Sequence, residues 1–112
     1  MKKSLALLYF FILTVGGVFA QGIEFFHGTY EEVLQKARAE GKQIFVDVYT
    51  SWCGPCKMMA KNVFTRQDVG DYYNSKFVCL KLDAEKESGH AFFQCYRANG
   101  YPSFFWLDAQ GN

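Results

Sequence analysis

The feature that most constrains the fold of this chain is a continuous run of strand-forming residues followed closely by a helix start. Residues 43–49 read Gln-Ile-Phe-Val-Asp-Val-Tyr, and Asp47 is the only charged residue in the run. Such a run is typical of a strand that is buried on both faces of a parallel sheet. Pro55 suits a first helical turn, and residues 57–64 continue the helical pattern. The segment therefore predicts an α/β domain.

Helical and strand patterns alternate along the rest of the chain. Thr29 suits an N-cap and Gly41 a C-terminal stop, which predicts a helix over residues 30–40. The other predicted elements are helices over residues 67–73 and 89–98, the second capped by Ser88, and strands over residues 76–82 and 103–107. Residues 22–29 are interpreted as a lead-in and residues 108–112 as a turn. This alternation predicts a parallel sheet with right-handed crossovers.

Composition excludes several classes of protein. The chain has 112 residues, of which 50% are hydrophobic and 21% charged, so one globular domain is expected. The formal net charge is +1, and without Lys2 and Lys3 ten basic residues face eleven acidic ones. The sequence has no basic patch with interleaved aromatics, glycine-rich phosphate loop or internal repeat. Nucleic-acid and nucleotide binding are therefore disfavoured.

The N-terminus has the layout of a secretory signal peptide. Lys2 and Lys3 precede an apolar run over residues 5–19, and Val18 and Ala20 suit a cleavage after Ala20. The alternative is an uncleaved anchor, but the run is shorter than the roughly 20 residues of a spanning helix and contains two glycines. We expect residues 1–20 to be a signal peptide, residues 21–112 to be the mature domain, and the protein to be periplasmic or otherwise exported.

Two of the four cysteines form a close pair. Cys53 and Cys56 are separated by two residues at a predicted helix start, where free N–H groups and the helix dipole stabilise a thiolate. We expect Cys53 to be the nucleophile and Cys56 to resolve the resulting mixed disulfide. Pro55 limits the freedom of the loop, and Gly54 keeps the approach open to a protein substrate.

A zinc site and a purely structural disulfide are weaker interpretations of the cysteines. A zinc site needs two more ligands at matching spacing, and the remaining candidates form no second close pair: Cys79, Cys95, His27 and His90. A structural disulfide between Cys53 and Cys56 would close a loop too short to restrict much chain entropy. We therefore predict a redox pair with no metal or cofactor. Cys79 is interpreted as a small buried hydrophobe, and a Cys79–Cys95 bridge stays open as an alternative.

The hexapeptide at residues 52–57, Trp-Cys-Gly-Pro-Cys-Lys, resembles the active-site motif of thioredoxins. Residues 42–112 are similar to the thioredoxin-like family, which includes the C-terminal domains of transmembrane thiol–disulfide interchange proteins. The resemblance implies a thioredoxin fold, in which helices flank a central sheet.

Such domains normally continue beyond Gly111 and Asn112 with an antiparallel strand and a helix, so this domain is expected to lack both. Residues 104–106, Phe-Phe-Trp, would then leave apolar surface and a strand edge open.

The resemblance also assigns roles. Asp47, six residues before Cys53, would have a raised pKa and exchange a proton with Cys56; its alternative is an aspartate bonded to backbone at the end of the strand. Pro102 stands at the place of a cis-proline beside the active site. The implied substrate-binding residues are Trp52, Gly54, Pro55, Tyr101 and Pro102. Tyr101 is bulkier than the family's usual residue there, and Cys79 would replace a lysine near the aspartate.

These observations lead to one principal hypothesis. The chain is expected to be an exported thiol–disulfide oxidoreductase that reduces protein disulfides through Cys53 and Cys56, because Gly54-Pro55 resembles the dipeptide of reducing thioredoxins. Its expected partners are exported proteins with disulfides and a membrane relay protein as electron donor. The alternatives are a disulfide oxidase or isomerase, and a peptide-binding module whose disulfide is only structural.

Overall fold

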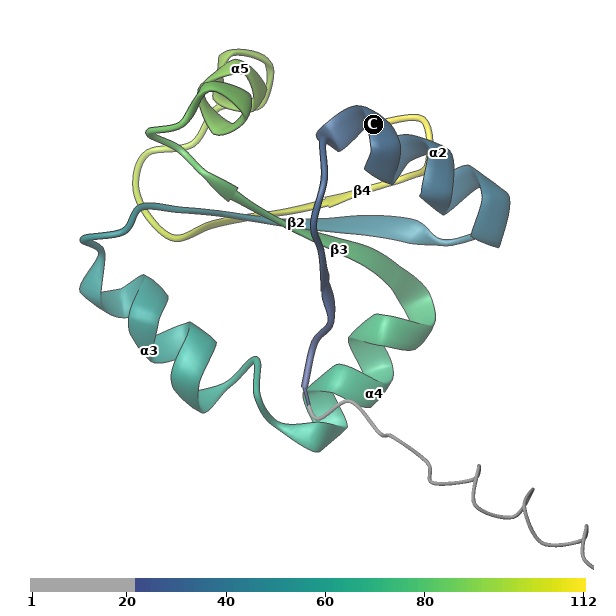
Figure 1. Ribbon diagram of the computed structural model, residues 1–112, viewed down its shortest axis with the longest axis horizontal. Helices are drawn as coiled ribbons and strands as arrows, with labels where there is room; N and C mark the ends of the chain where they lie inside the picture. Colours follow the sequence, from purple (N-terminus) through teal and green to yellow (C-terminus); the bar gives the residue numbers. More distant parts are fainter. Residues whose placement is uncertain (1–21) are drawn as a thin grey trace, which may run out of the picture.

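The structure is a computed structural model that describes residues 22–112, and the predicted signal peptide at residues 1–20 lies outside them. A central sheet runs through this domain with helices on both sides (Figure 1). Its elements are, in order, β1 (Phe25–Phe26), α2 (Tyr30–Glu40), β2 (Gln43–Tyr49), α3 (Gly54–Asn62), α4 (Gln67–Lys76), β3 (Phe77–Asp83), α5 (Glu87–Cys95) and β4 (Ser103–Leu107). The bounds of α2, β2 and β4 confirm the predicted ranges.

The four strands of the sheet lie in the order β1-β3-β2-β4. β3 is parallel to both β1 and β2, but β4 is antiparallel to β2. The expectation of an entirely parallel sheet is therefore wrong for β4. The reason is the route of the chain: β3 ends at Asp83, opposite Tyr49, and β4 begins at Ser103, opposite Val48, so the connection through α5 returns to the same end of the sheet.

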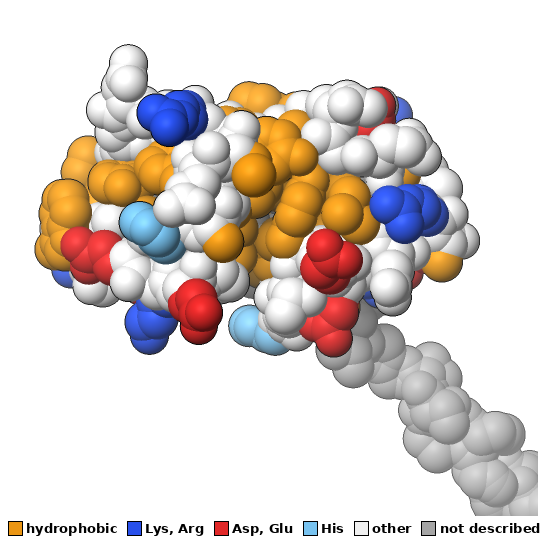
Figure 2. All heavy atoms as spheres, turned by 90° about the horizontal axis from the view of Figure 1, so that it is seen from above, with side chains coloured by type: hydrophobic (Ala, Val, Ile, Leu, Met, Phe, Trp, Pro, Cys, Tyr) orange, Lys and Arg blue, Asp and Glu red, His pale blue; other side chains and the backbone are white. Residues whose placement is uncertain are grey.

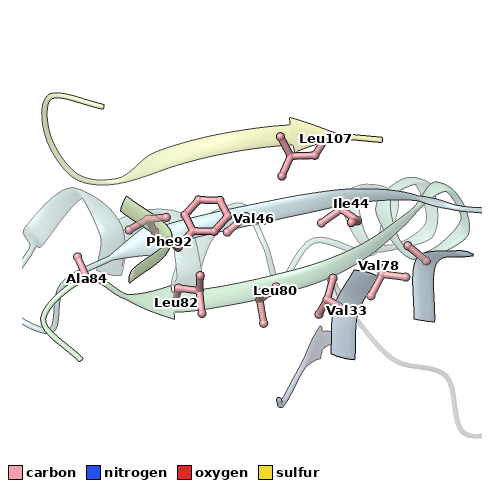
Figure 3. Close-up of a cluster of buried hydrophobic side chains, with 11 residues drawn as sticks. Val33, Ile44, Val46, Val78, Leu80, Leu82, Ala84, Phe92 and Leu107 are labelled. Atoms are coloured by element: carbon pink, nitrogen blue, oxygen red, sulfur yellow. The ribbon is translucent and has the colours of Figure 1, made fainter. Parts of the chain in front are cut away.

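Helices cover the sheet in two layers. In Figure 1, α2 and α5 lie on one side of the sheet, and α3 and α4 lie on the other. On the α2 and α5 side the buried cluster consists of Val33, Ala37, Ile44, Val46, Val48, Val78, Leu80, Leu82, Ala84, Phe92 and Leu107 (Figure 3). On the other side it consists of Phe45, Phe64, Phe77 and Cys79. The continuous run of β2 is explained by this arrangement, because successive side chains point to opposite faces and both are buried.

The ends of α2 show why its prediction succeeded. Thr29 and Glu32 form a capping box, in which the Thr29 hydroxyl accepts from the Glu32 N–H and the Glu32 carboxylate accepts from the Thr29 N–H. Gly41 ends the helix in the left-handed conformation, with φ 66°. Both signals are local, so the sequence alone could reveal them.

The predicted ends of the other helices and of β3 differ from the observed ones, and at α3 and α4 a tertiary contact accompanies the difference. α3 ends before Phe64, whose carbonyl accepts a hydrogen bond from the Ile23 N–H at 2.8 Å. α4 continues past Asn74, whose side chain bonds the Gly22 carbonyl and the Glu24 N–H. β3 is shifted by one residue. α5 begins at Glu87 and ends at Cys95, so the predicted Ser88 cap and the end at residue 98 are wrong.

β1 is absent from the predicted elements, which treat residues 22–29 as a lead-in. A strand of two residues carries no periodic signal, and pairing with Cys79 and Leu80 of β3 creates it. At the other end, the predicted turn is present: the Asp108 carboxylate accepts from the N–H groups of Gln110 and Asn112. β4 is an edge of the sheet formed by residues 22–112, and its Trp106 is 52% exposed.

Candidate functional site

A disulfide joins Cys53 and Cys56 where the loop after β2 enters α3. Cys53 is the N-cap of α3, and its Sγ accepts a hydrogen bond from the Cys56 N–H at 3.0 Å. Pro55 lies in the first turn, where a missing N–H leaves no bond unmade. Gly54 faces open space, because a Cβ there would meet no atom of the described residues within 4 Å. The pair is therefore held in a defined turn: Cys53 and Cys56 are only 3% and 6% exposed, and the open space lies at Gly54 between them.

This position suits reversible redox chemistry. The N–H groups and dipole of a helix N-terminus stabilise negative charge, so a thiolate at Cys53 would be favoured after reduction. Cys56 lies in the first turn of the helix that Cys53 caps, with a Cα–Cα distance of 5.3 Å to Cys53. The arrangement can thus alternate between a dithiol and a disulfide, which is the property that a thiol–disulfide exchange site requires.

Trp52 stands at the surface immediately before the disulfide, with 63% of its area exposed. Its indole Nε1–H donates a hydrogen bond to Glu85 Oε2 at 2.8 Å. The ring of Tyr101 meets the indole edge-on at 6.0 Å between centroids. Trp52 is therefore an exposed apolar surface next to Cys53 that is held from two sides.

The loop before β4 reaches the same end of the sheet. The peptide bond between Tyr101 and Pro102 is cis. Ser103, the next residue, pairs with Val48 close to the end of β2 from which the disulfide loop starts. Tyr101 also stacks on Phe93 of α5 at 5.7 Å. The structure thus brings the predicted residues of the two loops, 52–56 and 101–102, to one end of the sheet.

Asp47 is a buried carboxylic acid on β2 and is only 2% exposed. It alternates with Val46 and so shares a face with Phe45, the face that α3 and α4 cover. Lys81 Nζ lies 3.9 Å from Asp47 Oδ2, and Asp47 Oδ1 has no hydrogen-bond partner among residues 22–112. The alternative of an aspartate bonded to backbone is therefore not supported.

The surroundings of Asp47 determine its titration. Burial raises the pKa of Asp47 to about 6, and the nearby Lys81 charge opposes part of that rise. Lys81 is itself held between aromatic rings, 4.8 Å from the Tyr49 centroid and 5.4 Å from that of Phe25. A carboxyl group with such a pKa can both accept and return a proton close to neutral pH. Its exchange of a proton with Cys56 remains a prediction.

The residue beside Asp47 differs from the one expected. The resemblance placed Cys79 at the position of a lysine near the aspartate, but Cys79 pairs with Phe45 and is two residues away in register. Lys81 pairs with Asp47 and supplies the cation. In this structure the cation beside Asp47 therefore comes from Lys81, two positions beyond Cys79 on β3, and the strand register that decides this is not visible in the sequence.

Cys79 and Cys95 are both free thiols in the described domain. Cys79 is buried in the cluster with Phe45, and burial raises the pKa of its thiol to about 12. Cys95 is exposed at the end of α5, on the opposite side of the sheet. The alternative of a Cys79–Cys95 bridge is therefore wrong, and the interpretation of Cys79 as a buried hydrophobe is confirmed.

Two residues of the site escape prediction from the sequence. Lys81 could have been suspected because it is the only charged residue inside the apolar run at residues 77–82. Glu85 lies in a loop with several charged residues, and no pattern distinguishes it from its neighbours. Pairing between strands reveals the first, and only the three-dimensional approach of two loops reveals the second.

The helices and ligand-type side chains of residues 22–112 bear on membrane insertion and metal binding. No helix in this part of the chain has both the length and the apolar character needed to cross a membrane. Within the same residues, no group of three or more His, Cys, Asp or Glu side chains is arranged to hold a metal ion.

Comparison with known proteins shows which family this chain matches. A family model described as thioredoxin-like matches residues 26–109. Thiol:disulfide interchange protein DsbD 2 of Pseudomonas aeruginosa is 30% identical over 79 residues, which are 70% of this chain but 14% of that protein. The chain thus spans about a seventh of the length of this relative.

Solved structures share the same arrangement. The solution structure of a candidate disulphide-isomerase from Bacteroides thetaiotaomicron has a TM-score of 0.73 and 40% identity, and covers 85% of this chain and 78% of its own. The oxidised C-terminal domain of DsbD from Neisseria meningitidis has a TM-score of 0.59 and 21% identity, and covers 73% and 72% respectively. These likenesses confirm the predicted fold, a mixed α/β sheet with flanking helices.

Proposed function

Because this chain belongs to the thioredoxin-like family and carries a Cys53–Cys56 pair at the start of a helix, we propose that it is an exported enzyme that reduces disulfides of other proteins. The observation that carries the proposal is the position of Cys53: it is the N-cap of α3, and its Sγ already receives an N–H hydrogen bond. That environment favours the thiolate that begins disulfide exchange.

The reaction consists of two exchanges. In the dithiol form, the Cys53 thiolate attacks one sulfur of a substrate disulfide, which forms a mixed disulfide and releases the other sulfur as a thiolate. Cys56 then attacks Cys53, which restores the Cys53–Cys56 bond and releases the second substrate thiol. The substrate gains two electrons and two protons, and the enzyme dithiol loses the same number.

Asp47 is the proposed proton carrier for Cys56. It shares the sheet face that α3 covers, it is buried, and its pKa of about 6 suits transfer near neutral pH. Taking the proton of Cys56 would make Cys56 a thiolate when the mixed disulfide must be resolved. The proposal expects that Asp47→Asn slows resolution while the first attack by Cys53 is retained.

Substrate binding is assigned to the exposed residues around the pair. Trp52 and Tyr101 offer aromatic surface on one side, and the exposed residues Gly54 and Pro55 border the disulfide on the other, although the two cysteines themselves are buried. Pro102 is proposed to bring a backbone segment beside the substrate, which could pair with it as an added strand. One side of α3, together with Val63 just after it, also borders an apolar groove of about 710 Å³.

The proposal also includes the direction of electron transfer and the location of the protein. The Gly54-Pro55 dipeptide resembles that of reducing thioredoxins, so we expect a potential close to about −270 mV and not near the about −120 mV of a strong oxidant. Export after cleavage at Ala20 would place the protein in the periplasm or outside the cell. An exported reductant needs an electron donor, for which we propose a membrane relay protein.

A trapping experiment tests the proposal. Cys56→Ser cannot resolve the mixed disulfide, so it should accumulate covalent adducts with exported proteins that dithiothreitol releases. Cys53→Ser is the matched control: it keeps the exposed thiol of Cys95, so it shows any adducts formed elsewhere on the protein, and it should lack those formed through Cys53. A Cys56→Ser protein that forms no adducts would support the alternative of a peptide-binding module, in which the disulfide is only structural.

The redox potential distinguishes the two enzymatic directions. Isomerase or oxidase activity is the second candidate, because the Bacteroides structure that is 40% identical is described as a candidate disulphide-isomerase. Equilibration with glutathione gives the potential of the Cys53–Cys56 pair. A value near that of strong oxidants would contradict reduction and favour this second candidate.

A further inference from the structure

We propose that Glu85 is a positioning residue of the thiol–disulfide site, where its carboxylate holds the Trp52 indole in the orientation that a protein substrate meets. The inference rests on the proposed function, because the substrate concerned is the protein disulfide that Cys53 attacks. Glu85 touches neither sulfur of the pair in this scheme and acts through Trp52.

The contact geometry is specific. Glu85 Oε2 accepts the indole Nε1–H at 2.8 Å, although both residues lie at the surface. On another side, the Tyr101 ring meets the indole edge-on at 6.0 Å. We call Trp52, Glu85 and Tyr101 the indole clamp. It joins three segments that are distant in the sequence: the disulfide loop, the β3–α5 loop and the loop before β4.

The backbone that carries Glu85 is itself fixed. The Glu85 N–H donates to the Asp83 carboxylate at 3.0 Å, and the Lys86 N–H donates to the Asp83 carbonyl at 3.0 Å. The Ala84 N–H donates to the carbonyl of Tyr49, the last residue of β2, at 2.8 Å. The loop is thus tied to the end of the strand that leads to Cys53, so the Glu85 side chain starts from a defined place.

α5 supports the clamp from both ends. Near its start, a Cβ on Gly89 would lie 2.0 Å from the Asp83 carbonyl oxygen, so the helix sits directly against the loop of Glu85. One turn further on, Phe93 stacks under Tyr101 at 5.7 Å. The carboxylate and the aromatic edge that contact Trp52 are therefore placed by one rigid element.

The function of such a clamp follows from the place of Trp52 in the chain. Trp52 is exposed and directly precedes Cys53, so a polypeptide joined to Cys53 must meet it. An indole without its acceptor would sample several rotamers, and ordering it on binding costs about two- to tenfold in affinity. Because Glu85 already orders the indole in the free protein, this cost does not arise when the substrate binds. Small disulfides that reach Cys53 without covering Trp52 should not gain from it.

The experiment compares Glu85→Ala, Glu85→Gln and Glu87→Ala in the otherwise intact protein. Glutamine keeps a carbonyl acceptor for the indole, and Glu87→Ala removes an exposed carboxylate nearby that is not bonded to Trp52. Insulin serves as the protein disulfide and a small aromatic disulfide as the second substrate. The Trp52 Nε1–H resonance in a ¹H–¹⁵N spectrum reports the hydrogen bond without any turnover.

We expect Glu85→Ala to shift the Trp52 Nε1–H resonance and to raise the KM for insulin by roughly two- to tenfold, with kcat nearly unchanged. Its rate with the small disulfide should stay within about twofold of the wild type. Glu85→Gln should recover most of the KM, and Glu87→Ala should match the wild type. An unchanged resonance and KM in Glu85→Ala would overturn the inference, as would equal losses with both substrates. A wild-type protein that does not reduce insulin would instead contradict the proposed function itself.

Discussion

The two faces of the sheet are built from one strand but packed in different ways. Val46 of β2 lies on the α2 and α5 face, is fully buried and belongs to an entirely apolar cluster (Figure 3). Asp47, the next residue, is almost as buried on the α3 and α4 face, where it lies near Lys81, whose Nζ in turn lies over two aromatic rings. One face is thus built for packing alone, whereas the face toward α3 contains an ionisable pair.

This difference between the two faces indicates that one mainly stabilises the fold, whereas the other also serves the function. Burying apolar side chains contributes roughly 1.5–3 kcal/mol each, and the α2 and α5 face collects many of them. A buried carboxyl group costs free energy when it is ionised, so its presence on the other face indicates a use other than stability. That face also carries the helix with the disulfide, which is where proton transfer would be needed.

Hydrophobic side chains are also unevenly distributed over the surface of the domain. The view of Figure 2 shows hydrophobic side chains gathered between polar ones on one side of the domain. The partly buried aromatics that pack on the α2 and α5 cluster include Tyr30, Phe93, Tyr96, Tyr101 and Phe105. Even the face built for packing therefore supports the site, because Phe93 and Tyr101 reach the disulfide end of the sheet.

The largest expected effect comes from placing a carboxyl group on the wrong face. Val46→Asp should lower the free energy of unfolding by at least about 4 kcal/mol, because the new carboxyl group would lie in the apolar cluster of the described residues and apolar packing is lost. Urea unfolding, monitored by far-UV circular dichroism, measures this loss of stability. Val46→Ala, the control for lost packing, should cost about 2 kcal/mol. Equal stabilities of the two variants would show that the two faces do not differ in this way.

The second effect is a pH dependence due to Asp47. Its pKa is raised on folding to about 6, so the folded state binds the proton more tightly and stability is greatest at low pH. Between about pH 4 and about pH 8 this group should therefore lower the free energy of unfolding by about 2.4 kcal/mol.

Asp47→Asn should lack this part of the pH dependence, so the difference in stability between variant and wild type should grow as pH rises through 6. Thermal unfolding across the pH range measures it. Asp71→Asn, a change at an exposed aspartate, is the control and should follow the wild-type curve. Parallel curves for Asp47→Asn and wild type would contradict the assigned titration.

A smaller effect concerns the cation that accompanies the buried acid. Lys81→Met should raise the pKa of Asp47 above its present value of about 6, by about one unit, because the positive charge 3.9 Å from Oδ2 is lost. A ¹³C NMR titration of the side-chain carboxyl measures the shift. Lys57→Met, at an exposed position, should leave the titration unchanged. An identical midpoint in both variants would mean that Lys81 does not tune Asp47.

The smallest effect is expected at the cysteines outside the site. With the Cys53–Cys56 disulfide intact, iodoacetamide at about pH 8 should label exposed Cys95 quickly and spare Cys79, because Cys79 is buried and the pKa of its thiol is raised to about 12. Mass spectrometry of the native and the urea-unfolded protein counts the labels. Rapid labelling of native Cys79 would show that the α3 and α4 face opens more readily than its packing indicates.

Much of this protein could be predicted from local sequence signals. The run at residues 43–49, the capping residues of α2 and the close cysteine pair each act within a few residues, and all appear in the structure as predicted. The signals failed where a distant contact decided the outcome. β1 exists through pairing with β3, and α4 extends because Asn74 bonds the segment before β1.

The features of the site also fall into those set by local sequence and those set by distant contacts. Sequence alone determined that Cys53 and Cys56 share a helical turn and that an acid precedes them on a buried strand, because spacing along the chain fixes both. Only the tertiary structure decided that Lys81 faces Asp47, that Glu85 holds Trp52, and that β4 runs antiparallel. These features depend on strand register and on the approach of separate loops, which are set by packing across the whole domain and leave no periodic trace in the sequence.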